Sequence, residues 1–160
     1  MKTKNAKRAR ITAPRELHLI DIENEIGKAE PSATEVAQFR DFYLAFNNVP
    51  QDAHIVVGAS SPLALLAIAD GWQGARSVYK QGKDGADLAL LEVALDEGAA
   101  GRFGVVVIAS GDHAFTEAVD TLQARDVDVR VFARKYGTHH TLYNHCRDVR
   151  TFTELEFSAA

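Results

Sequence analysis

Short apolar runs alternate with amphipathic segments along the chain. The apolar runs are rich in valine, isoleucine and leucine, and they cover residues 16–21, 54–59, 75–79, 103–109 and 127–133. The segments between them repeat apolar residues at spacings of three and four, which is typical of helices that pack one face on a sheet. This alternation predicts an α/β fold with three layers, α/β/α, around a mostly parallel central sheet.

Capping and chain-breaking residues indicate where the predicted helices begin and end. Ser32 and Glu35 follow Pro31 with the spacing of a capping box. Ser61 and Pro62 indicate a second helix start, because proline suits the first turn of a helix. The expected helices cover residues 32–47, 60–71, 84–97, 112–125 and 138–147, with a loop over 22–31 and a last edge strand over 148–152.

The length and composition are those of one soluble globular domain. The chain has 160 residues, of which 46% are hydrophobic and 25% charged. Its apolar runs are far too short to span a bilayer, so no membrane partner is expected. Cys146 is the only cysteine, which excludes an internal disulfide and favours the cytoplasm.

The charge is distributed unevenly along the chain. Residues 1–15 hold six lysines and arginines and no acid, whereas the remainder is acidic enough to give the whole chain a net charge of −4. This predicts a flexible basic arm over residues 1–15 and a single domain over residues 16–160. Such an arm binds the phosphate backbone of a nucleic acid or remains a solvated tail, and the sequence leaves both readings open.

Aspartates stand at several points where a strand is expected to end or a helix to begin. Asp21 closes the first apolar run, Asp112 follows the fourth, and Asp84 and Asp87 begin a helix. The carboxyl ends of parallel strands share one edge, so these acids are expected to meet there. Carboxylates that are held together repel one another unless a cation lies between them, and oxygen ligands suit Mg²⁺ or Mn²⁺. The alternative for each aspartate is ordinary capping of a turn or helix.

Polar neighbours of these acids are candidate substrate contacts. Ser60 and Ser110 follow predicted strands and are placed to contact a phosphate, and Asn24 is placed to bond Asp21 or a phosphate oxygen. Lys83 and Asp84 are two further candidate substrate contacts, and the charge of Lys83 would attract a phosphate backbone. Glu23 is assigned a secondary place. The histidines near Cys146 match no standard zinc-site spacing, so zinc is not expected.

The chain resembles the NYN domain family, a branch of the PIN-like nucleases. The resemblance covers most of residues 16–135 and rests on DIEN at Asp21, KDGAD at Lys83 and SGDHAF at Ser110. It implies a PIN-like three-layer fold and metal-dependent cleavage of RNA. It also implies that Asp21, Asp87 and Asp112 bind the metal, that Asn24 supports Asp21, and that Ser110 lines the site.

The chain departs from the family pattern at one important position. The family commonly has a second acid in S-G-D-x-D-F, where this chain has Ala114. The resulting hypothesis is a ribonuclease that holds one Mg²⁺ or Mn²⁺ with Asp21, Asp87 and Asp112 and acts on single-stranded RNA. The alternative is a degenerate PIN-like module that binds nucleic acid or protein without cleavage. A homodimer is compatible with either hypothesis, and a receiver domain or HAD phosphatase fits the acids less well.

Overall fold

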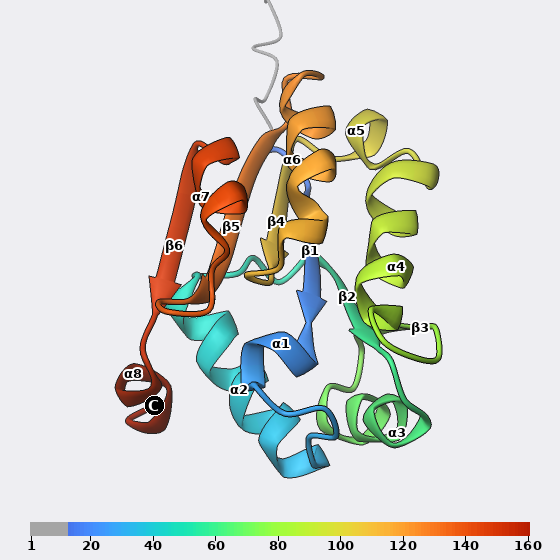
Figure 1. The fold of residues 1–160 in the computed structure, drawn as a ribbon, viewed down its shortest axis with the longest axis vertical. Coiled ribbons are helices and arrows are strands. Elements are labelled where there is room, and N and C mark those ends of the chain that lie inside the picture. The colour runs from blue at the N-terminus through green and yellow to red at the C-terminus, as the bar shows by residue number, and fades with distance from the viewer. Residues whose placement is uncertain (1–12) are drawn as a thin grey trace, which may run out of the picture.

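Six parallel strands form the central sheet. The computed structural model describes residues 13–160 and places the strands in the order β3-β2-β1-β4-β5-β6 (Figure 1). They span Glu16–Asp21 (β1), His54–Ala59 (β2), Arg76–Tyr79 (β3), Val105–Ala109 (β4), Asp128–Arg134 (β5) and Asp148–Phe152 (β6). Every neighbouring pair is parallel, so the predicted α/β class is confirmed and the sheet is wholly, rather than mostly, parallel. Residues 1–12, which make up most of the predicted basic arm, lie outside the described residues.

Helices cover both faces of the sheet and complete the predicted three layers (Figure 1). One face carries α4 (Gly85–Leu91), the π-helical turn η1 (Glu92–Asp96), α5 (Ala99–Arg102), the 3₁₀ turn η2 (His113–Phe115), α6 (Thr116–Gln123) and α7 (His140–His145). The other face carries α1 (Ile22–Ile26), α2 (Ala33–Phe46), α3 (Pro62–Gly71) and α8 (Glu154–Ser158). No helix within residues 13–160 is long and apolar enough to cross a bilayer.

The strand order reverses between β1 and β4, at the centre of the sheet. From β1 the chain proceeds outward through β2 to β3, and from β4 it proceeds to β5 and β6 on the other side. All five residues of β4 are buried, as expected for a strand covered on both faces. In open α/β sheets the crevice at such a reversal, outside the carboxyl ends of the strands, is where ligands bind.

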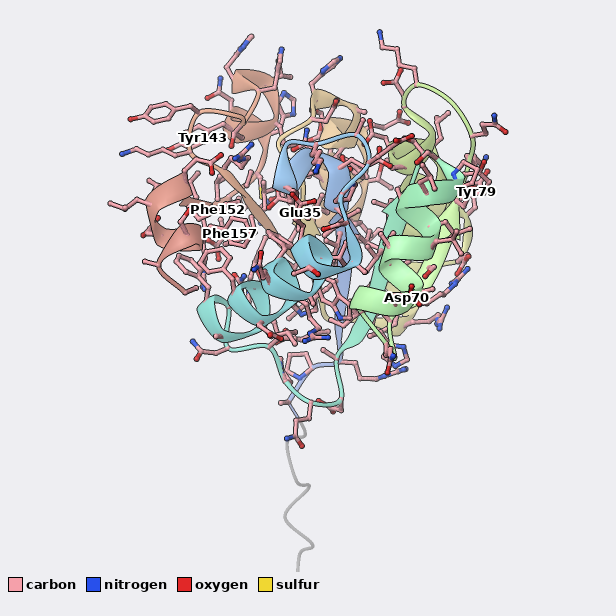
Figure 2. The ribbon with its side chains drawn as sticks, turned by 90° about the horizontal axis from the view of Figure 1, so that it is seen from below. Glu35, Asp70, Tyr79, Tyr143, Phe152 and Phe157 are labelled. Atoms are coloured by element: carbon pink, nitrogen blue, oxygen red, sulfur yellow. The ribbon has the colours of Figure 1, made fainter. Side chains whose placement is uncertain are left out.

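Aromatic packing joins α2 to the end of β6. The ring centroids of Phe42 and Phe152 lie 5.3 Å apart, and the rings of Phe132 and Phe152 stack at 5.0 Å. Phe157 of α8 lies beside Phe152 (Figure 2). α2 and α3, on which Glu35 and Asp70 are labelled in Figure 2, contact each other on the same face of the sheet. The spacing of apolar residues in α2 predicts a buried stripe of Val36, Phe39, Phe42, Tyr43 and Phe46; the first four are buried, whereas Phe46 is 38% exposed.

The predicted loop over residues 22–31 is wrong at its start, where the chain forms α1. Asp21 caps this helix by accepting a hydrogen bond from the Asn24 N–H, and Gly27 ends it with a left-handed φ of 76°. Five residues are too few to show helical periodicity, so the sequence pattern did not reveal the helix. The helical backbone of α1 sets the directions in which the side chains of Glu23, Asn24 and Glu25 leave the end of β1.

The single helix expected over residues 84–97 is also wrong in detail. It is α-helical only as far as Leu91, after which it widens into the π-turn η1. π-Turns are rare and have no sequence signature of their own, so a continuous helix was the natural expectation. The short helices α5 and α8 were likewise not predicted.

Candidate functional site

Three parts of the chain meet at the carboxyl edge of the sheet, beside the β1–β4 reversal. Asp21 ends β1, the turn of residues 110–112 follows β4, and the start of α4 packs over β1 and β2. They enclose a cavity of about 180 Å³ lined by Asp21, Glu23, Asn24, Ser60, Asp84, Gly85, Ala86, Asp87 and Asp112. The predicted convergence of acids from distant segments therefore occurs at this edge.

Asp21 is buried and held by its neighbours. Its Oδ2 accepts a hydrogen bond from the Ser110 hydroxyl at 3.1 Å, and its Oδ1 accepts one from the Asn24 N–H at 3.3 Å. Only 4% of the residue is exposed. These contacts hold both carboxylate oxygens of Asp21 in place, and the carboxylate lies next to Asp87 of α4.

One hydrogen bond joins the turn of residues 110–112 to α1, and a second closes the turn itself. The Gly111 N–H donates to Asn24 Oδ1 at 3.0 Å, and the Asp112 N–H donates to Ser110 Oγ at 3.2 Å. Asp112 also accepts from the Ala114 N–H at 2.8 Å, so it caps η2 as the alternative reading expected. Capping occupies one carboxylate oxygen of Asp112 and leaves the side chain at the cavity wall.

Asp87 reaches the site from α4. Asp84 occupies the N-cap position of α4, as expected, but it has a left-handed φ of 61° and its side chain makes no capping hydrogen bond within residues 13–160. Asp87 is 6% exposed, and its carboxyl lies close enough to that of Asp21 for each group to shift the pKa of the other. Two ionised carboxylates this close repel one another, so the pair favours holding one proton when no cation is bound.

The electrostatics of the pair place that proton on Asp87. Burial raises the pKa of Asp87, and the hydrogen bond from Asp87 to Asp21 together with the nearby charges of Asp21, Asp112 and Asp84 raises it further, to about 8. Burial also raises the pKa of Asp21, although hydrogen bonds from Asp87, Asn24 and Ser110 oppose the change. The site thus holds more negative charge than its surroundings stabilise, and a cation would relieve it.

Glu23 lines the cavity, although its position in the sequence predicts only a secondary role. Its carboxylate accepts hydrogen bonds from the Ser60 N–H at 2.8 Å and from the Ser60 hydroxyl at 2.5 Å. α1 turns Glu23 toward the end of β2, a direction that a loop would not have specified. Ser60 lines the cavity as expected, with its hydroxyl directed to Glu23.

The two residues predicted from KDGAD as substrate contacts occupy different positions. Asp84 lines the cavity, whereas Lys83 is exposed and lies outside the cavity lining. Lys80, on the same loop, forms an ion pair with Glu92. Of these three residues, only Asp84 is therefore part of the cavity itself.

Glu25 is a buried acid that the sequence reasoning missed. It is fully buried, and neither carboxyl oxygen has a hydrogen-bond partner among residues 13–160. Burial raises the pKa of Glu25 well above its ordinary value, and the charge of Asp21 adds to the rise while that of Arg134 opposes it. Its position on α1, directly behind the site, was hidden because residues 22–26 were expected to be a loop.

The donor set fits one divalent cation through the Asp21–Asp87 pair. The pair supplies buried oxygen ligands that share one proton, the arrangement that Mg²⁺ or Mn²⁺ neutralises. Within residues 13–160, no three His, Cys, Asp or Glu side chains converge closely enough to form a complete ligand set. Such a cation would therefore need water as well as protein ligands, which is normal for Mg²⁺.

Gly85 lets α4 approach the cavity, and its replacement is expected to destabilise the protein. A Cβ at this position would lie 1.9 Å from the Lys80 carbonyl oxygen, so Gly85→Ala must displace the loop or the helix start. The expected loss is about 1–3 kcal/mol in the free energy of unfolding, measured by urea denaturation. Gly101→Ala in α5 is the matched control, since nothing lies within 4 Å of its Cβ, and an equal loss there would contradict this reasoning.

Comparisons with known proteins identify a family and a similar fold. The NYN domain model matches residues 66–156, more than half of the chain, a range that includes Asp87 and Asp112 but not Asp21. A crystal structure of a protein of unknown function from Vibrio parahaemolyticus is similar, with a TM-score of 0.55 and 20% identity over 88% of this chain and 94% of its own. At that identity the similarity concerns the fold alone. A comparison with curated proteins finds no match.

Proposed function

The chain belongs to the NYN domain family, and we propose that it is a divalent-metal-dependent ribonuclease that cleaves single-stranded RNA. The observation that supports this most strongly is the buried Asp21–Asp87 pair at the strand-order reversal, with Asp112 on the cavity wall. A pair of carboxyls that share a proton in a solvent-facing cavity is unfavourable for stability. Such a pair is explained by a ligand that replaces the proton.

Asp21 and Asp87 are the proposed direct ligands of one Mg²⁺ or Mn²⁺, and Asp112 is proposed to act through water. A bound cation would lower the pKa of a coordinated water and offset negative charge on the scissile phosphate. Ser110 and Asn24 orient Asp21 through the hydrogen bonds described above. Preorganised ligands of this kind lose little conformational freedom when the substrate binds.

The remaining cavity residues are proposed to contact the RNA strand. Asn24 offers its side-chain NH₂ group to phosphate oxygens, and Ser60 stands beside the strand at the cavity wall. Lys83 attracts the backbone from outside the cavity. Asp84 would face sugar hydroxyls rather than phosphate, because like charges repel. Glu23 holds Ser60 in place through its two hydrogen bonds.

A second candidate function rests on Ala114. This residue stands where the family commonly has a further acid, and its N–H is committed to capping by Asp112. Loss of that acid favours a module that binds RNA but does not cut it. The two functions share the same surface and differ in the need for metal.

Cleavage of labelled single-stranded RNA in Mn²⁺ and in EDTA separates the two functions. The ribonuclease proposal expects cleavage by the wild-type protein in Mn²⁺, none in EDTA, and loss of activity in Asp112→Asn. RNA binding without cleavage at any Mn²⁺ concentration would instead select the binding module. Equal cleavage by the wild type and the variant would place the activity elsewhere or in a contaminant.

A further inference from the structure

Three exposed imidazole rings, the histidine stack, lie against one another at the edge of the proposed site. The rings of His139 and His140 stack, with centroids 4.4 Å apart and 29° between the ring planes. The rings of His113 and His139 are tilted by 41°, with centroids 4.8 Å apart. All three residues are exposed. His113 Nδ1 lies 3.3 Å from Asp112 Oδ1, so the stack begins at the cavity wall.

The loop between β5 and α7 holds the stack against the turn of residues 110–112. The His139 N–H donates to the Gly111 carbonyl at 2.8 Å, and a Cβ on Gly111 would lie 2.2 Å from the Gly137 carbonyl oxygen. His139 Nδ1 accepts from the Thr141 N–H at 3.2 Å, which orients its ring. The loop and the turn therefore pack as one unit.

The loop that precedes His139 also carries an exposed aromatic ring and a cation. Tyr136 is 93% exposed, and the Lys135 ammonium lies 5.7 Å from the centre of its ring. Lys135 forms no ion pair with any residue in the described part of the chain, 13–160. An exposed ring beside a cation that is free to bind phosphate is the composition of surfaces that bind single-stranded nucleic acid.

We propose that His113, His139 and His140 form a base-stacking subsite, which holds the nucleobase next to the scissile phosphate of single-stranded RNA. This inference rests on the proposed ribonuclease function, because the stack gains its meaning from its contact with Asp112. Flat rings that face solvent offer the surface on which bases stack without sequence preference.

Removal of the rings tests the subsite in EDTA, where binding does not depend on metal. The variant combines His113→Leu and His140→Leu with His139→Asn, which retains a residue suited to the helix N-cap. Its affinity for a fluorescein-labelled single-stranded RNA of about ten nucleotides is expected to fall on the order of tenfold. Fluorescence anisotropy measures the affinity, and thermal unfolding checks that the variant is folded.

Ring-preserving substitutions and a distant histidine provide the controls. His113→Phe combined with His140→Tyr is expected to retain affinity within about twofold, because the rings stack without an imidazole charge. His145→Leu removes an exposed histidine that is paired with Asp120 at 2.9 Å and should leave binding unchanged. Equal binding by the wild type and the triple variant would overturn the subsite, as would a loss of binding in the ring-preserving variant that matches the loss in the triple variant.

Failure of the subsite and failure of the ribonuclease proposal give different results. Wild-type cleavage in Mn²⁺ with unchanged binding by the triple variant removes only the subsite. Ring-dependent binding without cleavage by the wild type in Mn²⁺ removes only the ribonuclease and retains the stack as a binding surface. Absence of RNA binding by the wild type overturns both proposals.

Discussion

Asp21→Asn is expected to reduce metal-dependent RNA cleavage by a factor of about 1000 and, at the same time, to stabilise the metal-free protein. The loss of activity follows because the substitution removes the ionised member of the carboxyl pair, and a metal's contribution to charge stabilisation amounts to several kcal/mol. The gain in stability follows because Asp87 no longer faces a second buried carboxylate. Opposite effects on activity and stability distinguish a ligand-binding residue from a structural one.

Two measurements on the same preparations check this prediction. Initial rates of cleavage in Mn²⁺ give the activity, and urea denaturation in EDTA at pH 8 gives the free energy of unfolding. Mn²⁺ is expected to raise the melting temperature of the wild type by binding only the folded state, and to have little effect on Asp21→Asn. Asp52→Asn is the matched control, since Asp52 is exposed in the loop before β2, at the opposite edge of the sheet. Joint loss of activity and stability in Asp21→Asn would contradict the proposal.

The framework of the fold and the outline of the site follow directly from the sequence. The valine-rich runs predicted five of the strands, and the short segment at residues 148–152 supplied the sixth as an edge strand. The acids at 21 and 112 were expected to meet because parallel strands share a carboxyl edge, and β1 and β4 are neighbours. Side-chain chemistry at strand ends is readable in this way because the topology forces those ends together.

The parts that sequence could not supply depend on local backbone geometry. The helical turn that places Glu23 on Ser60 has only five residues, so no periodicity marks it. Asp84 has a left-handed backbone, and α4, which follows it, lines the cavity. The three-residue spacing of Asp84 and Asp87 does not reveal this conformation, because it is equally consistent with an ordinary helix cap. The shared proton of Asp21 and Asp87 depends on burial, which a sequence does not contain.

Glu25→Met is expected to raise the free energy of unfolding by about 2–4 kcal/mol at pH 8, because it removes a buried carboxyl that has no hydrogen-bond partner among residues 13–160. Methionine is unbranched and adapts to the space that the glutamate side chain occupies. Arg134, the nearby cation, retains its ion pair with Glu154, so the substitution leaves no buried charge uncompensated. Glu30→Met, at an exposed position before α2, should change the free energy of unfolding by less than about 0.5 kcal/mol.

The pH dependence of unfolding separates Glu25 from the carboxyl pair. An acid whose pKa is higher in the folded than in the unfolded state binds more protons when folded, so stability falls as pH rises through the interval between the two values. Glu25 contributes such a fall above its unfolded value of 4.5, and Asp87 contributes another between 3.8 and about 8. Saturating Mn²⁺ should abolish the Asp87 part alone, because the cation replaces its proton. Glu25→Met should reduce the slope of the free energy of unfolding against pH, both in EDTA and in Mn²⁺. If the variant kept the wild-type slope, Glu25 would be ionised and paired in the folded protein, contrary to this prediction.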